Sequence, residues 1–382
     1  MHADDIAGEE FEAWFRLLGS VGRGPARRLL AACGSAPAVF ATRAATLREI
    51  AGARAAEALA KPPEQHAVWL AAARAWLAGG DETGAPRRVL TIADPGYPAA
   101  LLQTADPPLL LYVHGDASRL AAPMLAMVGS RHPTAQGADN ARAFAAALAR
   151  SGWTIVSGLA RGIDAAAHEG ALAAGPGGAG TVAVVGTGPD IVYPPAHRTL
   201  ARRILHHGVI VSELAPGTPA LKENFPQRNR IIAGLAAGTL VVEAAVRSGS
   251  LITARLAAEA GREVFAIPGS IHSPQSRGCH ALLKQGAKLV ETAEDVAEEL
   301  RGAGAGVRQA SLALAAVPAP ADAPAPEDPL LAAIGHDPVT LDALLARTGE
   351  TVQRLSARLL DLELEGRIAR LPGGLYQRRG SA

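Results

Sequence analysis

Four turns rich in glycine, serine and arginine carry the residues of this chain that are best suited to chemistry. Each joins a short apolar run to a helix-like segment, or opens such a segment. Arginine offers a planar fork of donors, and amides at a helix start point toward an anion, so these groups suit phosphate oxygens. They hold phosphates and do not break bonds. The turns are Gly129-Ser130-Arg131, Ser157-Gly158-Leu159-Ala160-Arg161-Gly162, Gln227-Arg228-Asn229-Arg230 and Ser248-Gly249-Ser250.

Each turn also has a structural interpretation that needs no ligand. Asp164, just after the second turn, could cap a helix or form a salt bridge, and His168 is typical of a buried, hydrogen-bonded histidine. At least one of Ser248 and Ser250 is suited to capping a helix. The sequence leaves these alternatives open for each turn taken alone.

The third turn places its cations where a helix repels them. Pro226 predicts a helix beginning directly after it, which puts Arg228, Asn229 and Arg230 in the first turn, near the positive end of the helix dipole. A bound phosphate, or a buried carboxylate such as Glu243, would compensate for this placement. The surrounding segment from 193 to 262 is rich in cations, namely Arg198, Arg202, Arg203, Lys222, Arg228, Arg230, Arg247, Arg255 and Arg262.

The middle of the chain must position these turns. From about residue 89 to 300, short Val/Ile runs alternate with helical patterns, which predicts an α/β fold with a parallel sheet and crossover helices. The expected strands are 109–113, 125–128, 154–157, 182–185, 209–212, 240–243, 263–267 and 288–290, and among the expected helices are 138–150, 163–173, 227–235 and 251–260. Ligands of such folds collect at the carboxyl ends of the strands, where all four turns fall.

Composition narrows the class of protein. The chain has 382 residues, 49% of them hydrophobic, so it is long enough for two or three domains with a sizeable core. Its net charge of +1 requires that any nucleic-acid binding rest on a local basic surface. Two distant cysteines, an acidic start and no long apolar run predict a cytoplasmic protein without a membrane span. No metal or cofactor site is expected.

Two glycine-rich segments resemble loops that bind nucleotides, but each lacks part of the required pattern. Gly186-Thr187-Gly188 lacks the third glycine and the distal acid of a dinucleotide site. The segment 176–181 resembles the phosphate loop of phosphoribohydrolases, which would make the chain a nucleotide-processing enzyme on a Rossmann-like scaffold. That enzyme needs a carboxylate where this chain has Val184, and the segment precedes a strand instead of opening a helix. We interpret it as a loop, and the enzyme remains the alternative.

The order of the motifs over more than half of the chain resembles the DNA processing protein A (DprA/Smf) family. The matching segments include Asp94-Pro95-Gly96-Tyr97-Pro98, Gly129-Ser130-Arg131, Ser157-Gly158-Leu159-Ala160-Arg161-Gly162, Arg228-Asn229-Arg230 and Ser248-Gly249-Ser250-Leu251-Ile252-Thr253. The resemblance implies an extended Rossmann-like fold and no catalysis. It implies a homodimer that binds and protects incoming single-stranded DNA and helps to load the RecA recombinase in natural transformation. Single-strand binding protein is a further candidate partner.

Carried onto this chain, the resemblance implies one pocket for DNA. Its cations would be Arg131, Arg161, Lys222, Arg228 and Arg230, and its amides, amide side chain and hydroxyls would come from Gly129, Ser130, Ser157, Gly158, Gly162, Asn229, Ser248, Gly249 and Ser250. Phe225 is the one aromatic candidate near these turns for stacking on a base. We therefore expect sequence-tolerant binding, dominated by the DNA backbone and sensitive to salt.

The two ends of the chain predict separate modules. Residues 1–82 are expected to form a helical domain of the sterile-alpha-motif type, in which 17–30 resemble a helix-hairpin-helix that either touches DNA or serves protein interaction. The Rossmann-like core would span 83–300 and an Ala/Pro-rich linker 301–328. Residues 329–382 predict three helices and a β-hairpin, as in a winged helix. Because Asp361, Glu363 and Glu365 offset its arginines, protein contact is favoured over duplex binding.

Overall fold

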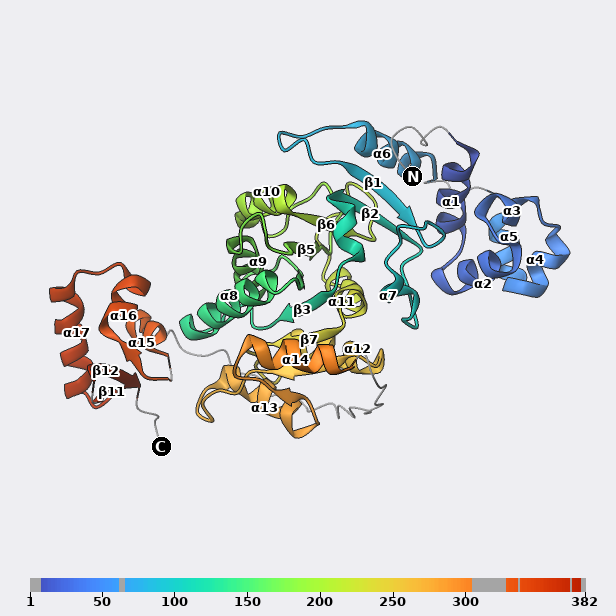
Figure 1. Ribbon diagram of the computed structural model, residues 1–382. Helices are drawn as coiled ribbons and strands as arrows, with labels where there is room; N and C mark the ends of the chain where they lie inside the picture. The colour runs from blue at the N-terminus through green and yellow to red at the C-terminus, as the bar shows by residue number, and fades with distance from the viewer. Residues whose placement is uncertain (1–7, 62–65, 304–327, 336, 372, 379–382) are drawn as a thin grey trace.

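A central sheet with helices on both faces lies between a group of helices at the N-terminus and a small unit at the C-terminus (Figure 1). The computed structural model describes residues 8–61, 66–303, 328–335, 337–371 and 373–378. Most of the expected linker, 304–327, lies outside the described residues. In the described part of the chain, no helix is long and apolar enough to cross a membrane.

The central sheet has nine strands in the order β1-β2-β6-β5-β4-β3-β7-β8-β9. Strands β3 to β9 pair in parallel, whereas β2 runs antiparallel to both β1 and β6. The strands are β1 Arg87–Thr91, β2 Leu110–Gly115, β3 Met124–Val128, β4 Thr154–Ser157, β5 Thr181–Val184, β6 Gly208–Ser212, β7 Gly238–Val241, β8 Glu263–Ala266 and β9 Lys288–Leu289.

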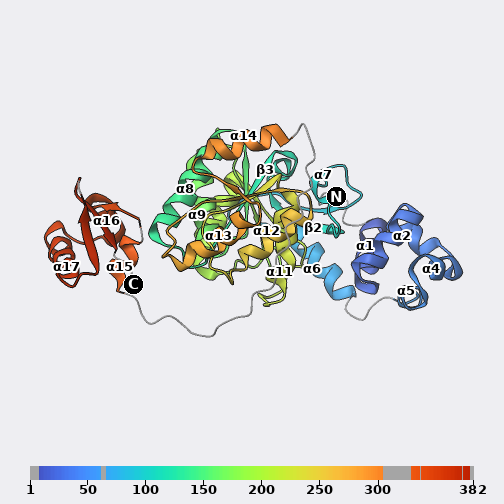
Figure 2. The same cartoon turned by 90° about the horizontal axis from the view of Figure 1, so that it is seen from below.

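Two helical layers cover this sheet because its strands are apolar on both faces. Leu125 and Met127 of β3 pack toward α8, α9 and α14, while Ala126 and Val128 face α11, α12 and α13. Figure 2 shows the helices on either side of the strands. The helices are α8 Ala135–Arg150, α9 Ile163–Ala173, α10 Arg198–His207, α11 Asn224–Leu235, α12 Ser250–Glu259, α13 Arg277–Lys284 and α14 Ala293–Ala303, with the shorter α7 Ala99–Leu102, η2 Ala117–Ala121, η3 Pro195–His197 and η4 Pro274–Ser276.

The strand order creates a switch point between β3 and β7. From β3 the chain adds β4, β5 and β6 on one side, and α11 then returns it to the other side of β3, where β7, β8 and β9 follow. The loops after β3 and β7 therefore diverge at the carboxyl edge of the sheet. In open α/β sheets this divergence leaves a crevice for a ligand.

The expected mostly parallel, doubly wound sheet is confirmed, and three local features differ from the sequence prediction. β1 was not predicted, and it adds an antiparallel edge strand whose first two residues are the half-buried Arg87 and Arg88. The helix predicted at 227–235 begins at Asn224, so Pro226 lies inside its first turn. Proline is tolerated there because the first amides of a helix have no partner within it. α14 also extends to Ala303, past the expected start of the linker at Arg301.

The N-terminal helices pack against the antiparallel end of the sheet. Trp14 and Leu29 share a buried cluster with Leu109, while Phe11 and Trp76 pack on Tyr112 of β2. This part of the chain thus buries its apolar face partly against the sheet. Its helices are α1 Glu9–Ser20, α2 Arg23–Cys33, α3 Ala36–Ala41, α4 Ala44–Ala51, α5 Ala53–Leu59 and α6 His66–Ala78.

The C-terminal unit has the winged-helix arrangement that the sequence predicted, around a hydrophobic core of its own. Its sheet has the order β10-β12-β11, and Gly373 and Gly374 adopt positive φ in the turn of the hairpin. Arg347 joins the unit to the core through an ion pair of 2.9 Å with Asp139 of α8. The elements are α15 Pro329–Ile334, β10 Val339–Thr340, α16 Leu341–Thr348, α17 Val352–Leu364, β11 Ile368–Leu371 and β12 Leu375–Arg378.

Candidate nucleic-acid interface

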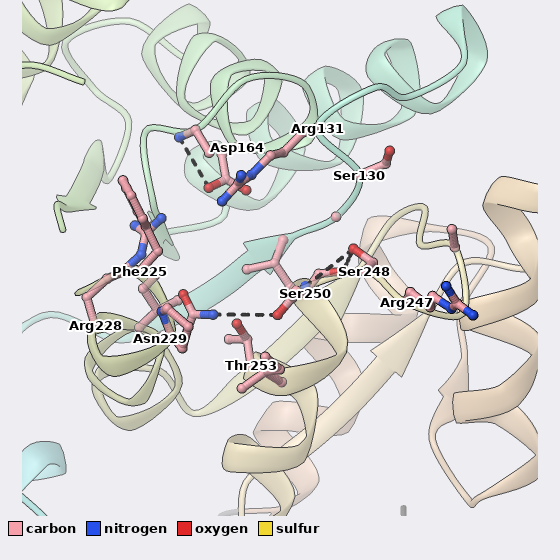
Figure 3. Close-up of a pocket in the computed structure, with 18 of the residues that line it drawn as sticks. Ser130, Arg131, Asp164, Phe225, Arg228, Asn229, Arg247, Ser248, Ser250 and Thr253 are labelled. Atoms are coloured by element: carbon pink, nitrogen blue, oxygen red, sulfur yellow. Dashed lines mark hydrogen bonds between the residues drawn. The ribbon is translucent and has the colours of Figure 1, made fainter. Parts of the chain in front are cut away.

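A pocket of about 680 Å³ lies at the switch point of the sheet. The loop after β3, the loop after β7 and the N-terminal half of α11 line it (Figure 3). Four cations and one carboxylate are among the lining residues, so the pocket is electropositive in a nearly neutral chain. The predicted site residues that line it are Gly129, Ser130, Arg131, Lys222, Arg228, Asn229, Ser248, Gly249 and Ser250.

The loop after β3 is held tightly so that Arg131 can project from it. The Ser130 amide donates to the Glu243 carbonyl at 2.7 Å, and Ser130 Oγ accepts from the His132 amide at 3.1 Å. A Cβ at Gly129 would lie 2.6 Å from Ile163, so only glycine fits between this loop and α9. Arg131 itself is exposed.

Two aromatic rings form one wall of the pocket together with Arg131. The Arg131 guanidinium carbon lies 5.8 Å from the centroid of the Phe225 ring, and the Tyr193 ring lies 5.6 Å from that ring on centroids. Tyr193 is 47% exposed. The sequence predicts Phe225 as the stacking residue, and the structure adds Tyr193. Its position between β5 and α10, at the carboxyl edge of the sheet, was the available signal.

Arg228 lies on the floor of the pocket and is almost completely buried, with 6% of its surface exposed. It donates to the Val184 carbonyl and packs so closely on Gly158 that a Cβ there would overlap the guanidinium. Burial lowers the pKa of Arg228 to about 10 and the charge of Asp164 opposes that shift, so the group stays protonated at neutral pH. Arg228 is thus an internal cation held by the fold.

Of the two groups that would compensate the cations of this helix, a bound phosphate or a buried carboxylate such as Glu243, the Glu243 carboxylate is bonded elsewhere. Glu243 instead accepts from the amide and the hydroxyl of Thr134, at the start of α8. The carboxylate close to Arg228 is Asp164. Because α11 begins at Asn224, its cations also lie in the second turn and not in the first.

Arg230 lies outside the pocket lining, although it is only two residues from Arg228. It forms an ion pair with Glu213, and its Nη1 donates to the Asp106 carbonyl at 2.5 Å. Arg23 and Arg27 of α2 pair with the carboxylate of the same Asp106 at 3.0 and 2.5 Å. Arg230 thus belongs to a charged contact between the core and the N-terminal helices.

The turn between β4 and α9 satisfies its own polar groups. The Gly158 and Ala160 amides donate to Asp164 at 3.1 and 3.3 Å, and Ser157 Oγ donates to the Met127 carbonyl at 2.7 Å. These two amides and this hydroxyl are therefore engaged inside the protein. Burial raises the pKa of Asp164 above its ordinary value, although Arg228 and the two amides lower it.

The two other predicted residues of this turn, Gly162 and Arg161, do not take part in these hydrogen bonds. Gly162 has a φ of +78°, and a Cβ there would overlap the Ser130 carbonyl, so glycine lets the two loops touch. Arg161 is exposed and is not among the residues that line the pocket.

His168 is a buried structural histidine, as the sequence indicated. Thr181 Oγ1 donates to the Ile155 carbonyl, so its contact of 2.7 Å with Nδ1 makes Nδ1 the protonated nitrogen. Nε2 then accepts from the Leu159 amide at 3.2 Å. Burial lowers the pKa of His168 to about 3, so the ring is neutral in the folded protein.

The loop after β7 lines another part of the pocket. Ser248 Oγ lies 2.6 Å from Ser250 Oγ and accepts from the Ser250 amide at 3.3 Å, while Gly249 is the N-cap residue of α12. Asn229 Nδ2 donates to the Gly249 carbonyl at 3.5 Å, which ties α11 to this loop (Figure 3). Arg247 and Thr253 are further lining residues that were absent from the predicted set.

The segment 176–181, which resembles a phosphate loop, leads into the amino end of β5. The pocket lies at the carboxyl ends of the strands, so this segment is at the opposite edge of the sheet. Its position agrees with the interpretation as a loop.

The doubly wound sheet and an electropositive pocket at its switch point define an α/β protein of the Rossmann-like class, with a site suited to phosphate-bearing ligands. Residues 88–301 match the family described as DNA recombination-mediator protein A, and residues 314–374 match the DprA winged helix domain. The chain belongs to the DNA recombination-mediator protein A family, as the resemblance predicted. It is thereby assigned to DNA processing in recombination.

Three relatives illustrate how far the similarity extends. Protein Smf of Escherichia coli is 44% identical over 284 residues, which cover 74% of this chain and 75% of Smf. The crystal structure of DprA from Streptococcus pneumoniae has a TM-score of 0.65 at 37% identity and covers 75% of this chain and 97% of that one. DNA processing protein A of Helicobacter pylori, whose structure is described for its single-stranded DNA binding mode, has a TM-score of 0.51 at 29% identity and covers 56% and 96%.

Proposed function

We propose that this chain binds single-stranded DNA in the switch-point pocket and acts as a recombination mediator. The observation that carries the proposal is the juxtaposition of the cation Arg131 with the rings of Phe225 and Tyr193 in a pocket open to solvent. Single-strand binders combine cations for the backbone with aromatic rings for the bases. The single-stranded DNA binding mode described for the Helicobacter pylori relative supports the same assignment.

The surroundings of each residue suggest its role in this proposal. The exposed Arg131, Lys222 and Arg247 would bind phosphates, while Tyr193 and Phe225 would stack on bases. Arg161 would bind a phosphate outside the pocket. Hydroxyls and amides at the pocket wall would complete the phosphate contacts, and these come from Gly129, Ser130, Asn229, Ser248, Gly249 and Ser250.

The remaining predicted residues would position the pocket instead of touching DNA. Arg228 holds the floor through Val184 and Gly158, and Gly162 brings two loops together. Ser157 anchors its strand to β3, and Arg230 connects the core to the N-terminal helices.

A binding comparison of DNA forms tests the proposal. The full-length protein would be titrated into a fluorescently labelled oligothymidine and into a duplex of equal length, at several salt concentrations. We expect tighter binding of the single strand and a negative slope of log K against log salt, of about 0.7 for each phosphate contact. Equal affinity for both DNA forms, or an affinity that salt does not change, would contradict the proposal.

The mediator role extends the proposal to protein partners. We infer that the chain protects incoming strands in natural transformation and helps RecA to replace single-strand binding protein on them. We also infer that it works as a homodimer. Adding the protein to RecA and to DNA coated with single-strand binding protein should accelerate RecA filament formation, and no acceleration would refute this part. A gel-filtration series that shows a monomer at all concentrations would refute the dimer.

A further inference from the structure

Helix α17 of the winged-helix unit presents a seam of four exposed residues to solvent. Gln353, Ala357, Leu360 and Leu364 follow one another at spacings of four, three and four residues, which is the heptad pattern of a helix that packs on another helix. Leu360 is 55% exposed and Leu364 is 79% exposed. The opposite face of α17 packs into the winged-helix core through Leu355, Leu359 and Leu362.

The residues around the seam disfavour nucleic acid as its occupant. A winged helix that reads duplex DNA presents cations on this helix. Arg358 is instead tied down inside the unit, where it pairs with Glu350 at 2.5 Å and with Asp328 at 3.0 Å. The exposed Asp361 and Glu363 flank the leucines and would repel phosphates. An apolar stripe with charged flanks fits another helix.

The charges beside the seam are self-complementary. In heptad terms, Arg354 and Asp361 both follow the inner position d, and both are exposed. In an antiparallel pair of helices these flanking positions meet, so Arg354 of each copy lies beside Asp361 of the other. The same register sets Ala357 against Leu360 of the second copy, a small side chain facing a large one. A parallel pair would leave Arg354 without Asp361.

We propose that α17 pairs antiparallel with α17 of a second copy of this chain. The surface is separate from the DNA pocket, since α17 lies on the side of the winged-helix unit that faces away from the core (Figures 1 and 2). With 13 residues the helix is about 20 Å long. A seam of this length buries less than the roughly 1,200 Å² of a stable interface, so the association is weak and depends on protein concentration.

Charge exchange between two variants of the full-length protein tests this pairing. Arg354→Asp alone sets Asp against Asp361 of the second copy, and Asp361→Arg alone sets Arg against Arg354. Each variant should associate about tenfold more weakly than the wild type in sedimentation equilibrium. Mixing the two variants restores both ion pairs in the mixed complex, so the mixture should associate like the wild type.

Controls separate this surface from any other. Leu360→Glu should abolish the part of the association that α17 mediates, whereas Ile271→Glu removes an apolar side chain that is 74% exposed on the core and should leave that part unchanged. Circular dichroism checks that every variant is folded. Any association through other surfaces is the same in the wild type and in all variants, so differences between them report on α17 alone. The pairing is refuted if the mixture associates as weakly as its two components, or if Leu360→Glu associates like the wild type. Single-stranded DNA affinity should be the same throughout.

Discussion

Arg131 and Arg228 carry the same guanidinium group in opposite surroundings. Arg131 is exposed beside an aromatic ring, whereas Arg228 is buried under the pocket and bonded to the Val184 carbonyl. An exposed cation can bind a phosphate with little loss of hydration. A buried cation has already lost its hydration and depends on the hydrogen-bond acceptors and opposite charges around it. The two side chains therefore differ in what their removal does, namely a loss of affinity for Arg131 and a loss of stability for Arg228.

A methyl group at Gly158 should destabilise the protein through Arg228. In Gly158→Ala the new Cβ overlaps the guanidinium, which must leave its bond with Val184. We expect the free energy of unfolding in urea to fall by about 1–3 kcal/mol. Gly177→Ala is the matched control, because nothing lies within 4 Å of its Cβ, and it should change stability by less than about 0.5 kcal/mol. Equal stability of the two variants would show that Arg228 is not fixed in this way.

At the scale of elements, the turn between β4 and α9 is a self-contained support for the pocket. It anchors its amides on Asp164 and His168 and its Ser157 hydroxyl on β3. The neutral tautomer of His168 fits this network, because Nε2 must accept from Leu159. A second proton on the ring would make Nε2 a donor as well, and it would then face the N–H of Leu159 with no acceptor between them.

His168 should make stability depend on pH. Its pKa of about 3 in the fold is lower than the ordinary value of 6.5, so the unfolded chain takes up a proton first as the pH falls. The contribution of neutral His168 to the free energy of unfolding is complete above pH 7 and declines as the pH falls from 6.5 toward 3. Between pH 7 and pH 5 this residue should remove about 2 kcal/mol from the free energy of unfolding. Urea titrations at both pH values measure it.

The variant His168→Gln isolates this contribution. Glutamine can still accept a hydrogen bond but does not titrate, so the variant should be less stable at pH 7 and should lose about 2 kcal/mol less than the wild type on acidification. His114, whose pKa is lowered to about 4, titrates equally in both proteins. An unchanged pH dependence in the variant would mean that His168 is not neutral in the fold.

At the scale of the whole molecule, one charged cluster joins the N-terminal helices to the core. Asp106 accepts Arg23 and Arg27 from α2 and also contacts Arg230 of α11, while Glu213 pairs with Arg230. Because α11 also carries Arg228 and Asn229, this cluster connects the outer helices to the helix that forms the pocket floor. It is a structural contact between two parts of the chain.

Arg230→Ala should therefore weaken that contact and leave DNA binding nearly unchanged. The substitution leaves Glu213, with 16% of its side chain exposed, without its closest cation, and we expect a loss of about 1–3 kcal/mol in unfolding free energy. Hydrogen exchange should increase in α1 and α2, and single-stranded DNA affinity should stay within about twofold. A variant of full stability with much lower DNA affinity would show instead that Arg230 contacts the strand.

The sequence predicted the sheet well because alternating Val/Ile runs and helical periods are local signals. β1 was missed because it contains Arg87 and Arg88 and lies at an antiparallel edge. The burial of Arg228 and the partner of Glu243 could not be predicted, since they depend on which loops of distant strands meet. The contact between the rings of Tyr193 and Phe225, on one wall of the pocket, depends on the fold in the same way, because the two residues are 32 positions apart in the sequence.

Single-stranded DNA affinity of three arginine and lysine variants tests the central claim most directly. Arg131→Ala and Lys222→Ala each remove an exposed cation from the pocket, whereas Arg150→Ala removes an exposed cation at the far end of α8. We expect at least about tenfold weaker binding for Arg131→Ala, a smaller loss for Lys222→Ala, and a salt slope reduced by about 0.7 in each. Arg150→Ala should bind like the wild type. Unchanged affinity in both pocket variants, with the fold intact, would contradict the claim that this pocket holds the strand.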